Sequence, residues 1–288
     1  MKSLILAAAL AAGIALPASA APISILAAEN FYGEAAQAIG GDRVSVDSVI
    51  VAPGTDPHDF DPPPSVSRSV SSADVIIMNG ADYDHWMEHL LEAAPASGRA
   101  VINVADLIGV AEGDNPHVWY DPAAMPALAS ALADELSKRD PDGAAGYAER
   151  RDALLVKLAP IGEKVTELHA RYAGTPVVAT EPVFGYMAAA LGLKMENEAF
   201  QTAIMNETEP AARDVAAMED AIRTGKVKVL FYNGQVEDAF TRNLAELAKE
   251  AGVPIVPVTE TLPDGKSFAE WMLDTLDATA KALGGKTS

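Results

Sequence analysis

The stretch Ile76-Ile77-Met78-Asn79-Gly80 has a counterpart in the second half of the chain, Leu230-Phe231-Tyr232-Asn233-Gly234. Each stretch is a short apolar run typical of a buried strand, ends in the turn signal Asn-Gly, and is followed by a helical pattern. Because the same pattern occurs in both halves, we predict an α/β fold with two similar β/α lobes.

Further apolar runs alternate with helical patterns throughout. We expect strands at 23–27, 44–51, 75–78, 100–104, 176–180, 193–197, 227–232 and 254–258. We expect helices at 31–39, 83–93, 210–223, 239–251 and 268–283.

A 30-residue helical pattern, 143–172, lies between the halves and contains Pro160. At 1.5 Å per residue it would span about 45 Å, which is the length of a rigid spine rather than of a flexible linker. The predicted organisation is listed in chain order: a signal peptide at 1–20, a first lobe at 21–142, a spine helix at 143–172 and a second lobe at 173–288.

The first twenty residues have the pattern of a secretory signal. Lys2 precedes thirteen apolar or glycine residues at 4–16, and Ala18-Ser19-Ala20 forms a small-residue cleavage site. The chain has no cysteine, which excludes disulfides, thiolate metal sites and a lipid-modified cysteine. We therefore expect a freely diffusing periplasmic protein that is neither lipid-anchored nor membrane-inserted. We also expect it to be a monomer. The net charge of −20 argues against nucleic acid as a partner.

Two segments with similar chemistry point to a metal. They are Asp56-Pro57-His58-Asp59-Phe60-Asp61-Pro62 and Asn115-Pro116-His117-Val118-Trp119-Tyr120-Asp121-Pro122. Proline fixes its own φ and keeps its neighbour out of the helical region, so each imidazole is expected on a stiff loop. Two such segments in a chain with only five histidines indicate a divalent metal site, with Asp61 and Asp121 as partners that orient the imidazoles.

Four potential ligands follow predicted strands, where open α/β sheets bind their ligands. They are His58, His117, Glu181 and Glu260. The first two belong to one lobe and the last two to the other, so a cleft between the lobes is expected to collect them. Two neutral imidazoles and two carboxylates balance a divalent cation and suit Mn, Fe or Zn. The alternatives are that Glu181 only caps the next helix and that Glu260 is a solvated loop residue.

A competing motif is His85-Trp86-Met87-Glu88-His89, which spells the H-x-x-E-H signature of inverted zinc proteases. It gives the alternative function, a periplasmic zinc hydrolase. An amphipathic helix with Trp86 directed inward accounts for the same residues without any metal.

Several motifs together resemble one family. Gly54-Thr55-Asp56-Pro57-His58, Ala73-Asp74-Val75, Asn79-Gly80, Phe184-Gly185-Tyr186 and Leu191-Gly192-Leu193 are similar to the substrate-binding proteins of zinc and manganese ABC transporters. The resemblance covers essentially the whole chain after the signal. It implies a binding protein rather than an enzyme, with a metal ion as cargo, a membrane ABC permease as partner and no organic cofactor.

The resemblance also implies the ligand set His58, His117, Glu181 and Glu260. Zinc receptors of this family usually have His at the position of Glu181, whereas manganese and iron receptors have Glu. Many zinc receptors carry a His-rich loop before the second ligand, and residues 87–115 contain only His89. The family's last ligand is usually Asp, so Glu260 departs from the pattern. These features favour manganese or iron and leave zinc open.

Overall fold

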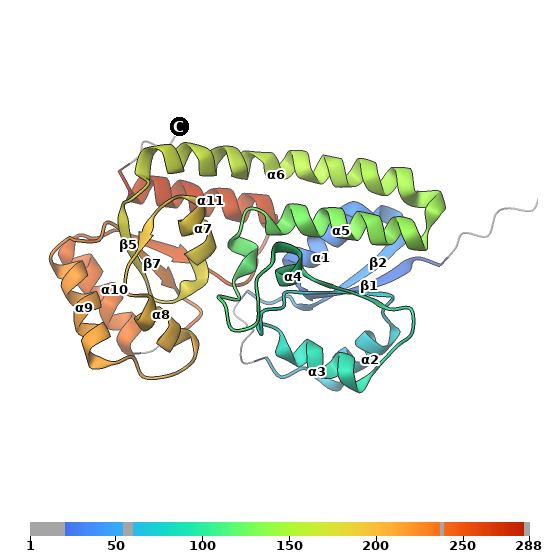
Figure 1. Cartoon of the computed structure of the whole chain (residues 1–288), viewed down its shortest axis with the longest axis horizontal. Coiled ribbons are helices and arrows are strands. Elements are labelled where there is room, and N and C mark those ends of the chain that lie inside the picture. The colour runs from blue at the N-terminus through green and yellow to red at the C-terminus, as the bar shows by residue number, and fades with distance from the viewer. Residues whose placement is uncertain (1–20, 54–59, 237–238, 285–288) are drawn as a thin grey trace, which may run out of the picture.

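The computed structural model describes residues 21–53, 60–236 and 239–284. The expected signal peptide and the predicted ligand His58 lie outside these residues. The described part has two α/β lobes that lie side by side along a common long helix (Figure 1).

The first lobe is built on a parallel sheet with the strand order β2-β1-β3-β4. Its strands are β1 (Ile23–Glu29), β2 (Val44–Ile50), β3 (Val75–Met78) and β4 (Ala100–Asn103). Its helices are α1 (Asn30–Gly40), α2 (Pro64–Ser72), α3 (His85–Ala93), α4 (Val104–Ile108) and α5 (Ala124–Arg139). All four residues of β3 are buried, as its continuous apolar sequence predicts.

The second lobe repeats this topology with the parallel order β6-β5-β7-β8. Its strands are β5 (Pro176–Ala179), β6 (Lys194–Met195), β7 (Leu230–Asn233) and β8 (Ile255–Val258). Its helices are α7 (Gly185–Ala190), α8 (Glu198–Met205), α9 (Ala212–Arg223), α10 (Ala239–Ala251) and α11 (Phe268–Ala282). The equal strand orders confirm the two similar lobes expected from the Asn-Gly repeat, because β3 and β7 occupy equivalent places.

The spine predicted between the lobes is α6 (Ala144–Tyr172), which continues through Pro160. It runs along both lobes, with α5 and α11 beneath it (Figure 1). The expected boundaries of the first lobe, the spine helix and the second lobe, after residues 142 and 172, stay a prediction. Side chains pack against one another across both boundaries.

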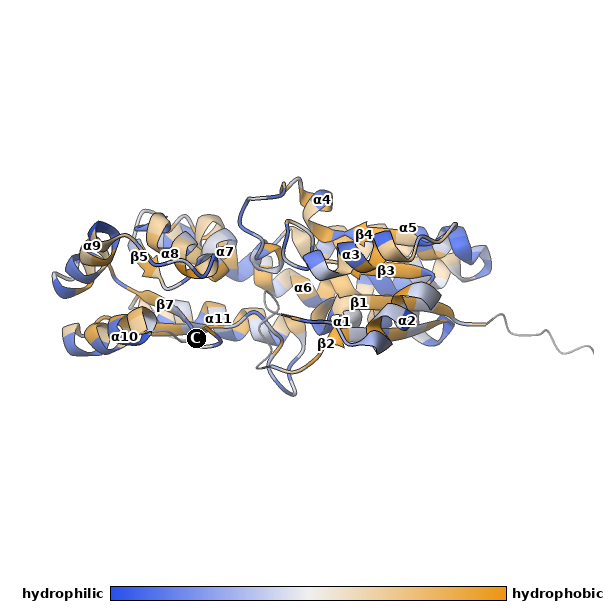
Figure 2. Ribbon diagram, turned by 90° about the horizontal axis from the view of Figure 1, so that it is seen from below, coloured by the Kyte–Doolittle hydropathy of each residue, from blue (hydrophilic) through white to orange (hydrophobic). Residues whose placement is uncertain are grey.

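Apolar packing joins the two lobes. The largest buried cluster extends from β1 to α11 without interruption, and hydrophobic residues gather on the strands and inward helix faces (Figure 2). The ring of Phe31 on α1 lies 5.7 Å from Trp271 and 6.2 Å from Phe268, both on α11. A polar contact accompanies them, from the Phe268 amide to Glu34 (2.8 Å). Each large buried side chain stabilises by about 1.5–3 kcal/mol and a single hydrogen bond by about 1 kcal/mol, so the aromatic packing dominates.

Within the described residues, no helix combines the length and the apolar character that crossing a bilayer requires.

Two buried carboxyl groups lie at the carboxyl edge of the first sheet. Glu29 ends β1, is fully buried, and neither of its carboxylate oxygens has a hydrogen-bond partner among the described residues. Burial raises its pKa well above the ordinary value, and the charge of Asp84 adds to this. Asp84 accepts hydrogen bonds from the Asn79 and Gly80 amides (2.6 and 2.9 Å), yet burial still raises its pKa to about 7.

We expect Glu29→Gln to stabilise the protein by an amount that grows with pH. The folded-state pKa of Glu29 lies above 4.5, so its contribution is fully present below pH 4.5 and is lost as pH rises through the folded-state pKa. Glutamine cannot ionise and avoids this loss. We compare the free energy of unfolding of Glu29→Gln with that of the wild type by urea denaturation. The advantage of the variant should increase by at most about 1.4 kcal/mol for each unit that the pH rises.

Glu270→Gln is the control, because the contribution of Glu270 to stability changes with pH in the opposite direction. Hydrogen bonds from the Ser267 amide and hydroxyl lower the pKa of Glu270, so its contribution is present at high pH and lost on acidification. A Glu29→Gln difference that stays constant with pH would contradict the burial argument.

Candidate metal-binding site between the lobes

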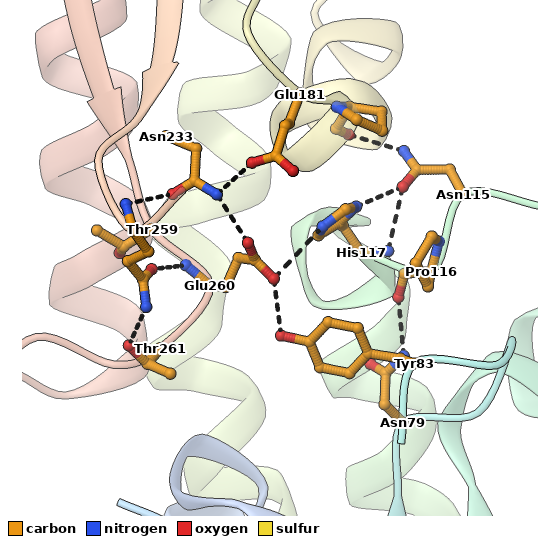
Figure 3. A network of polar contacts seen from close by, with 12 residues as sticks. Asn79, Tyr83, Asn115, Pro116, His117, Glu181, Asn233, Thr259, Glu260 and Thr261 are labelled. Atoms are coloured by element: carbon orange, nitrogen blue, oxygen red, sulfur yellow. Dashed lines mark hydrogen bonds and ion pairs between the residues drawn. The ribbon is translucent and has the colours of Figure 1, made fainter. Parts of the chain in front are cut away.

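Polar side chains from both sheets meet where the carboxyl ends of their strands face the lobe boundary (Figure 3). In each sheet the chain turns to opposite sides after its first two strands, which places a topological switch point beside β1 and β5. In the second lobe Glu181 follows β5, Asn233 ends β7 and Glu260 follows β8. Contacts across the boundary show that these strand ends face the first lobe.

His117 is the contribution of the first lobe. It precedes a 3₁₀ turn at Val118–Tyr120 and its side chain is fully buried. Its Nδ1 lies 2.6 Å from Asn115 Oδ1. Because the Asn115 amide group donates to the Pro182 carbonyl (2.8 Å), Oδ1 is the acceptor and Nδ1 carries the proton. A proton on Nδ1 leaves Nε2, which faces the second lobe, as the ring nitrogen that can ligate a metal.

The second lobe fixes Asn115 in place. The Tyr186 hydroxyl donates to the Asn115 carbonyl (2.6 Å), and burial raises the pKa of Tyr186 to about 12, so the phenol stays a donor. A Cβ at Gly185 would lie 2.7 Å from Asn115 Nδ2. Within Phe184-Gly185-Tyr186, the glycine leaves room for the Asn115 side chain and the tyrosine binds the Asn115 carbonyl.

Glu181 and Glu260 are the buried carboxylates of the second lobe, exposed by 3% and 0%. The Asn233 Nδ2 group donates to both, to Glu181 Oε2 at 2.5 Å and to Glu260 Oε1 at 2.7 Å. Glu260 Oε2 lies 3.6 Å from His117 Nε2. Three of the four predicted ligands therefore come from both lobes to one buried network.

A strained turn brings a further group to the site. Gly80, Ala81 and Asp82 after β3 all have positive φ, a conformation that is costly for the two non-glycine residues. This turn directs Tyr83 across the boundary, where its hydroxyl donates to Glu260 Oε2 (3.1 Å).

The loop that leads to residues 54–59 is also attached to the second lobe. The Pro53 carbonyl accepts hydrogen bonds from Thr261 Oγ1 (2.7 Å) and Gln235 Nε2 (3.0 Å). Gln235 Oε1 in turn accepts from the Glu260 amide (2.5 Å). The start of the first histidine loop is thereby held next to Glu260.

The residues expected to orient the imidazoles have other surroundings. Asp61 is exposed, and Asp121 Oδ1 accepts from the Ala123 amide (2.8 Å) ahead of α5. Nδ1 of His117 is bonded to Asn115, a residue that no sequence-based expectation includes although it lies two residues before the histidine. For Asn233 the sequence predicts only a turn. Neither amide carries a charge that would single it out in the sequence.

The arrangement is not a closed metal cage. Across the described residues, no three His, Asp or Glu side chains are placed to hold a metal ion as they stand. The Asn233 amide lies between the two carboxylates, and His58 is not described. Buried carboxylates are costly without a compensating cation or hydrogen bonds, so the chemistry of the donors fits a divalent ion.

The competing motif is placed on α3. The rings of His85 and His89 lie 6.0 Å apart with their planes at 88°, and both residues are exposed. The residues described around them complete no set of three ligands. Trp86 is buried, which matches the amphipathic helix expected without a metal.

Known proteins of similar sequence are named for metals. The chain is 26% identical over 247 residues to the manganese-binding lipoprotein MntA of Halalkalibacterium halodurans, covering 81% of this chain and 77% of that protein. It is 28% identical over 265 residues to the iron-binding protein YfeA of Yersinia pestis, with 86% and 82% covered. These names describe binding proteins rather than enzymes.

A solved structure shares the fold. The periplasmic zinc-binding protein TroA from Treponema pallidum superposes with a TM-score of 0.74 at 20% identity, covering 92% of this chain and 100% of that one.

The comparisons correct the expectation of a freely diffusing protein without a lipid anchor. Several matched relatives, MntA among them, are named lipoproteins. The expectation was wrong because it inferred the mode of attachment from a missing residue type, and the absence of cysteine does not determine how a protein is held at a membrane.

One family model matches residues 25–282, nearly the whole described chain. Its description is zinc-uptake complex component A, periplasmic (ZnuA). With the two-lobed fold and the boundary site described above, this match shows that the chain belongs to the ZnuA family of metal ABC transporter substrate-binding proteins.

Proposed function

We propose that this protein captures one divalent transition-metal ion, manganese, iron or zinc, and delivers it to the membrane permease of an ABC importer. The metal is cargo, and the protein performs no covalent chemistry. Imidazole nitrogens of His58 and His117 and carboxylate oxygens of Glu181 and Glu260 are the proposed ligands.

The observation that carries the proposal is the buried contact of 3.6 Å between His117 Nε2 and Glu260 Oε2. The two residues come from different lobes, and both side chains are fully buried. A neutral imidazole and a carboxylate are a common donor pair for divalent transition metals. Asn115 supports this role because it fixes the tautomer that exposes Nε2.

His58 is the ligand proposed from the sequence. The Pro53 carbonyl, five residues earlier, is bound by Gln235 and Thr261 beside Glu260. The loop therefore starts at the site, which supports a fourth donor from this side. With two neutral imidazoles and two carboxylates, the donors carry −2 and neutralise a divalent ion.

A carboxylate at position 181 and the lack of a His-rich segment at 87–115 favour manganese or iron as cargo. Zinc is nevertheless expected to bind tightly in vitro, because N- and O-donor sites follow the Irving–Williams order.

Metal should stabilise the folded protein. A ligand that binds only the native state adds about 2.7 kcal/mol at a hundredfold excess over Kd. We expect the thermal midpoint to rise with Mn(II) or Zn(II), measured by calorimetry, and not with equal Mg(II), which prefers an all-oxygen octahedral site. An unchanged midpoint with Mn(II), Fe(II) and Zn(II) would refute the proposed function.

Substitution distinguishes the boundary site from the motif on α3. His58→Ala and His117→Ala each remove a proposed ligand and should abolish tight binding, whereas the double variant His85→Ala/His89→Ala should retain it. Isothermal titration with Zn(II) measures both. The reverse pattern would favour the hydrolase alternative.

Asn115→Ala should weaken metal binding although Asn115 is not a proposed ligand. The imidazole loses its Nδ1 partner, and such outer-shell losses cost about 10–100-fold in affinity. Asp121→Asn is the matched control, since the Asp121 side chain accepts from the Ala123 amide ahead of α5 rather than from the His117 ring. Equal affinities for the Asn115 variant and the wild type would show that the tautomer is fixed in another way.

A further inference from the structure

We propose that Asn233 determines metal selectivity at this site. Its amide group holds one oxygen of Glu181 and one of Glu260, so that each glutamate binds the metal through its other oxygen alone. The inference rests on the proposed function, because it assigns these two carboxylates to the metal.

The orientation of the amide follows from its other contacts. The side-chain oxygen Oδ1 of Asn233 accepts from the backbone N–H of Gln235 (3.1 Å). The backbone N–H of Asn233 donates to Thr180 Oγ1 (3.0 Å). With Oδ1 engaged by a donor, the NH₂ group must face the carboxylates. Its two hydrogens match the two short contacts, 2.5 Å to Glu181 and 2.7 Å to Glu260.

The two oxygens of Glu260 have different surroundings (Figure 3). Oε1 is bonded to Asn233, while Oε2 faces the first lobe, 3.6 Å from His117 Nε2 and 3.1 Å from the Tyr83 hydroxyl. A metal beside His117 therefore meets Oε2. Bidentate binding by Glu260 would bring Oε1 to the metal as well. The hydrogen bond from Asn233 opposes this, because it draws electron density from Oε1 and fixes the orientation of the carboxylate, and the 1% exposure of Asn233 gives water little access to replace that bond.

The number of carboxylate oxygens at the metal affects selectivity. Zinc is satisfied by four ligands in tetrahedral geometry, whereas oxygen-rich octahedral sites suit manganese. Two monodentate glutamates give the metal two carboxylate oxygens, whereas two bidentate glutamates would give it four. By holding the coordination number low, Asn233 offsets the preference for manganese that carboxylate ligands introduce.

The first lobe supplies a matched control. Asn79 occupies the equivalent strand end, but its Nδ2 donates to the carbonyls of Gly80 and Pro116 (2.9 and 2.8 Å), and its Oδ1 accepts from Tyr32. It therefore supports the histidine segment without contacting a carboxylate. Asn79→Ala should change the affinities for both metals by the same factor.

The test is the ratio Kd(Mn)/Kd(Zn), measured by chelator competition in the wild type, Asn233→Ala, Asn233→Ser and Asn79→Ala. Asn233→Ala frees both carboxylates, and we expect the ratio to fall by about tenfold or more, the scale of outer-shell effects. Serine has one donor and can hold at most one carboxylate, so its ratio should lie between the others. X-ray absorption on the Mn(II) forms should show more oxygen neighbours in Asn233→Ala than in the wild type.

A ratio that is the same in the wild type and both Asn233 variants would overturn the inference while leaving metal capture intact. A fall of equal size in Asn79→Ala would overturn it as well. A wild-type protein that binds neither metal would instead refute the proposed function, and this inference with it.

Discussion

Two buried carboxylates set the main constraint on this structure. Glu181 and Glu260 are exposed by 3% and 0% at the lobe boundary, and one amide group bonds to both. Such a pair is unfavourable in a low-dielectric interior unless donors or a cation compensate it. Asn233 and Tyr83 supply hydrogen-bond donors to these carboxylates, and Gln235 accepts from the Glu260 amide, but the network does not close a cage. This arrangement supports the metal capture that we propose for the boundary.

The two lobes use equivalent strand ends for different purposes. Asn79 directly follows β3 and Asn233 is the last residue of β7, but one supports a backbone segment and the other holds carboxylates. Glu29 and Glu181 come at the ends of the first strands. Burial without partners raises the pKa of Glu29 and favours its neutral form, whereas Glu181 faces the boundary. The two lobes therefore share one strand topology. The contacts made by each strand end, including those with the other lobe, determine the role of its side chain.

Much of the fold could be predicted from sequence because its signals are local. Apolar runs such as Ile76–Met78 and the long pattern that became α6 depend on periodicity within a segment. The strand predicted at 193–197 is only Lys194–Met195, since so short an edge strand depends on its pairing with β5. The polar contacts of the site depend on residues up to 208 positions apart, as in the bond from Thr261 to the Pro53 carbonyl.

The sequence by itself determined the two-lobed α/β architecture, the spine and the residue types that indicated a metal, because strand and helix patterns and proline-flanked histidines are readable within a few residues. Only the tertiary structure decided that Asn115 rather than Asp121 is bonded to His117, and that Asn233 lies between Glu181 and Glu260. The reason is physical. A neutral amide gains a specific role only from the donors and acceptors that folding places around it.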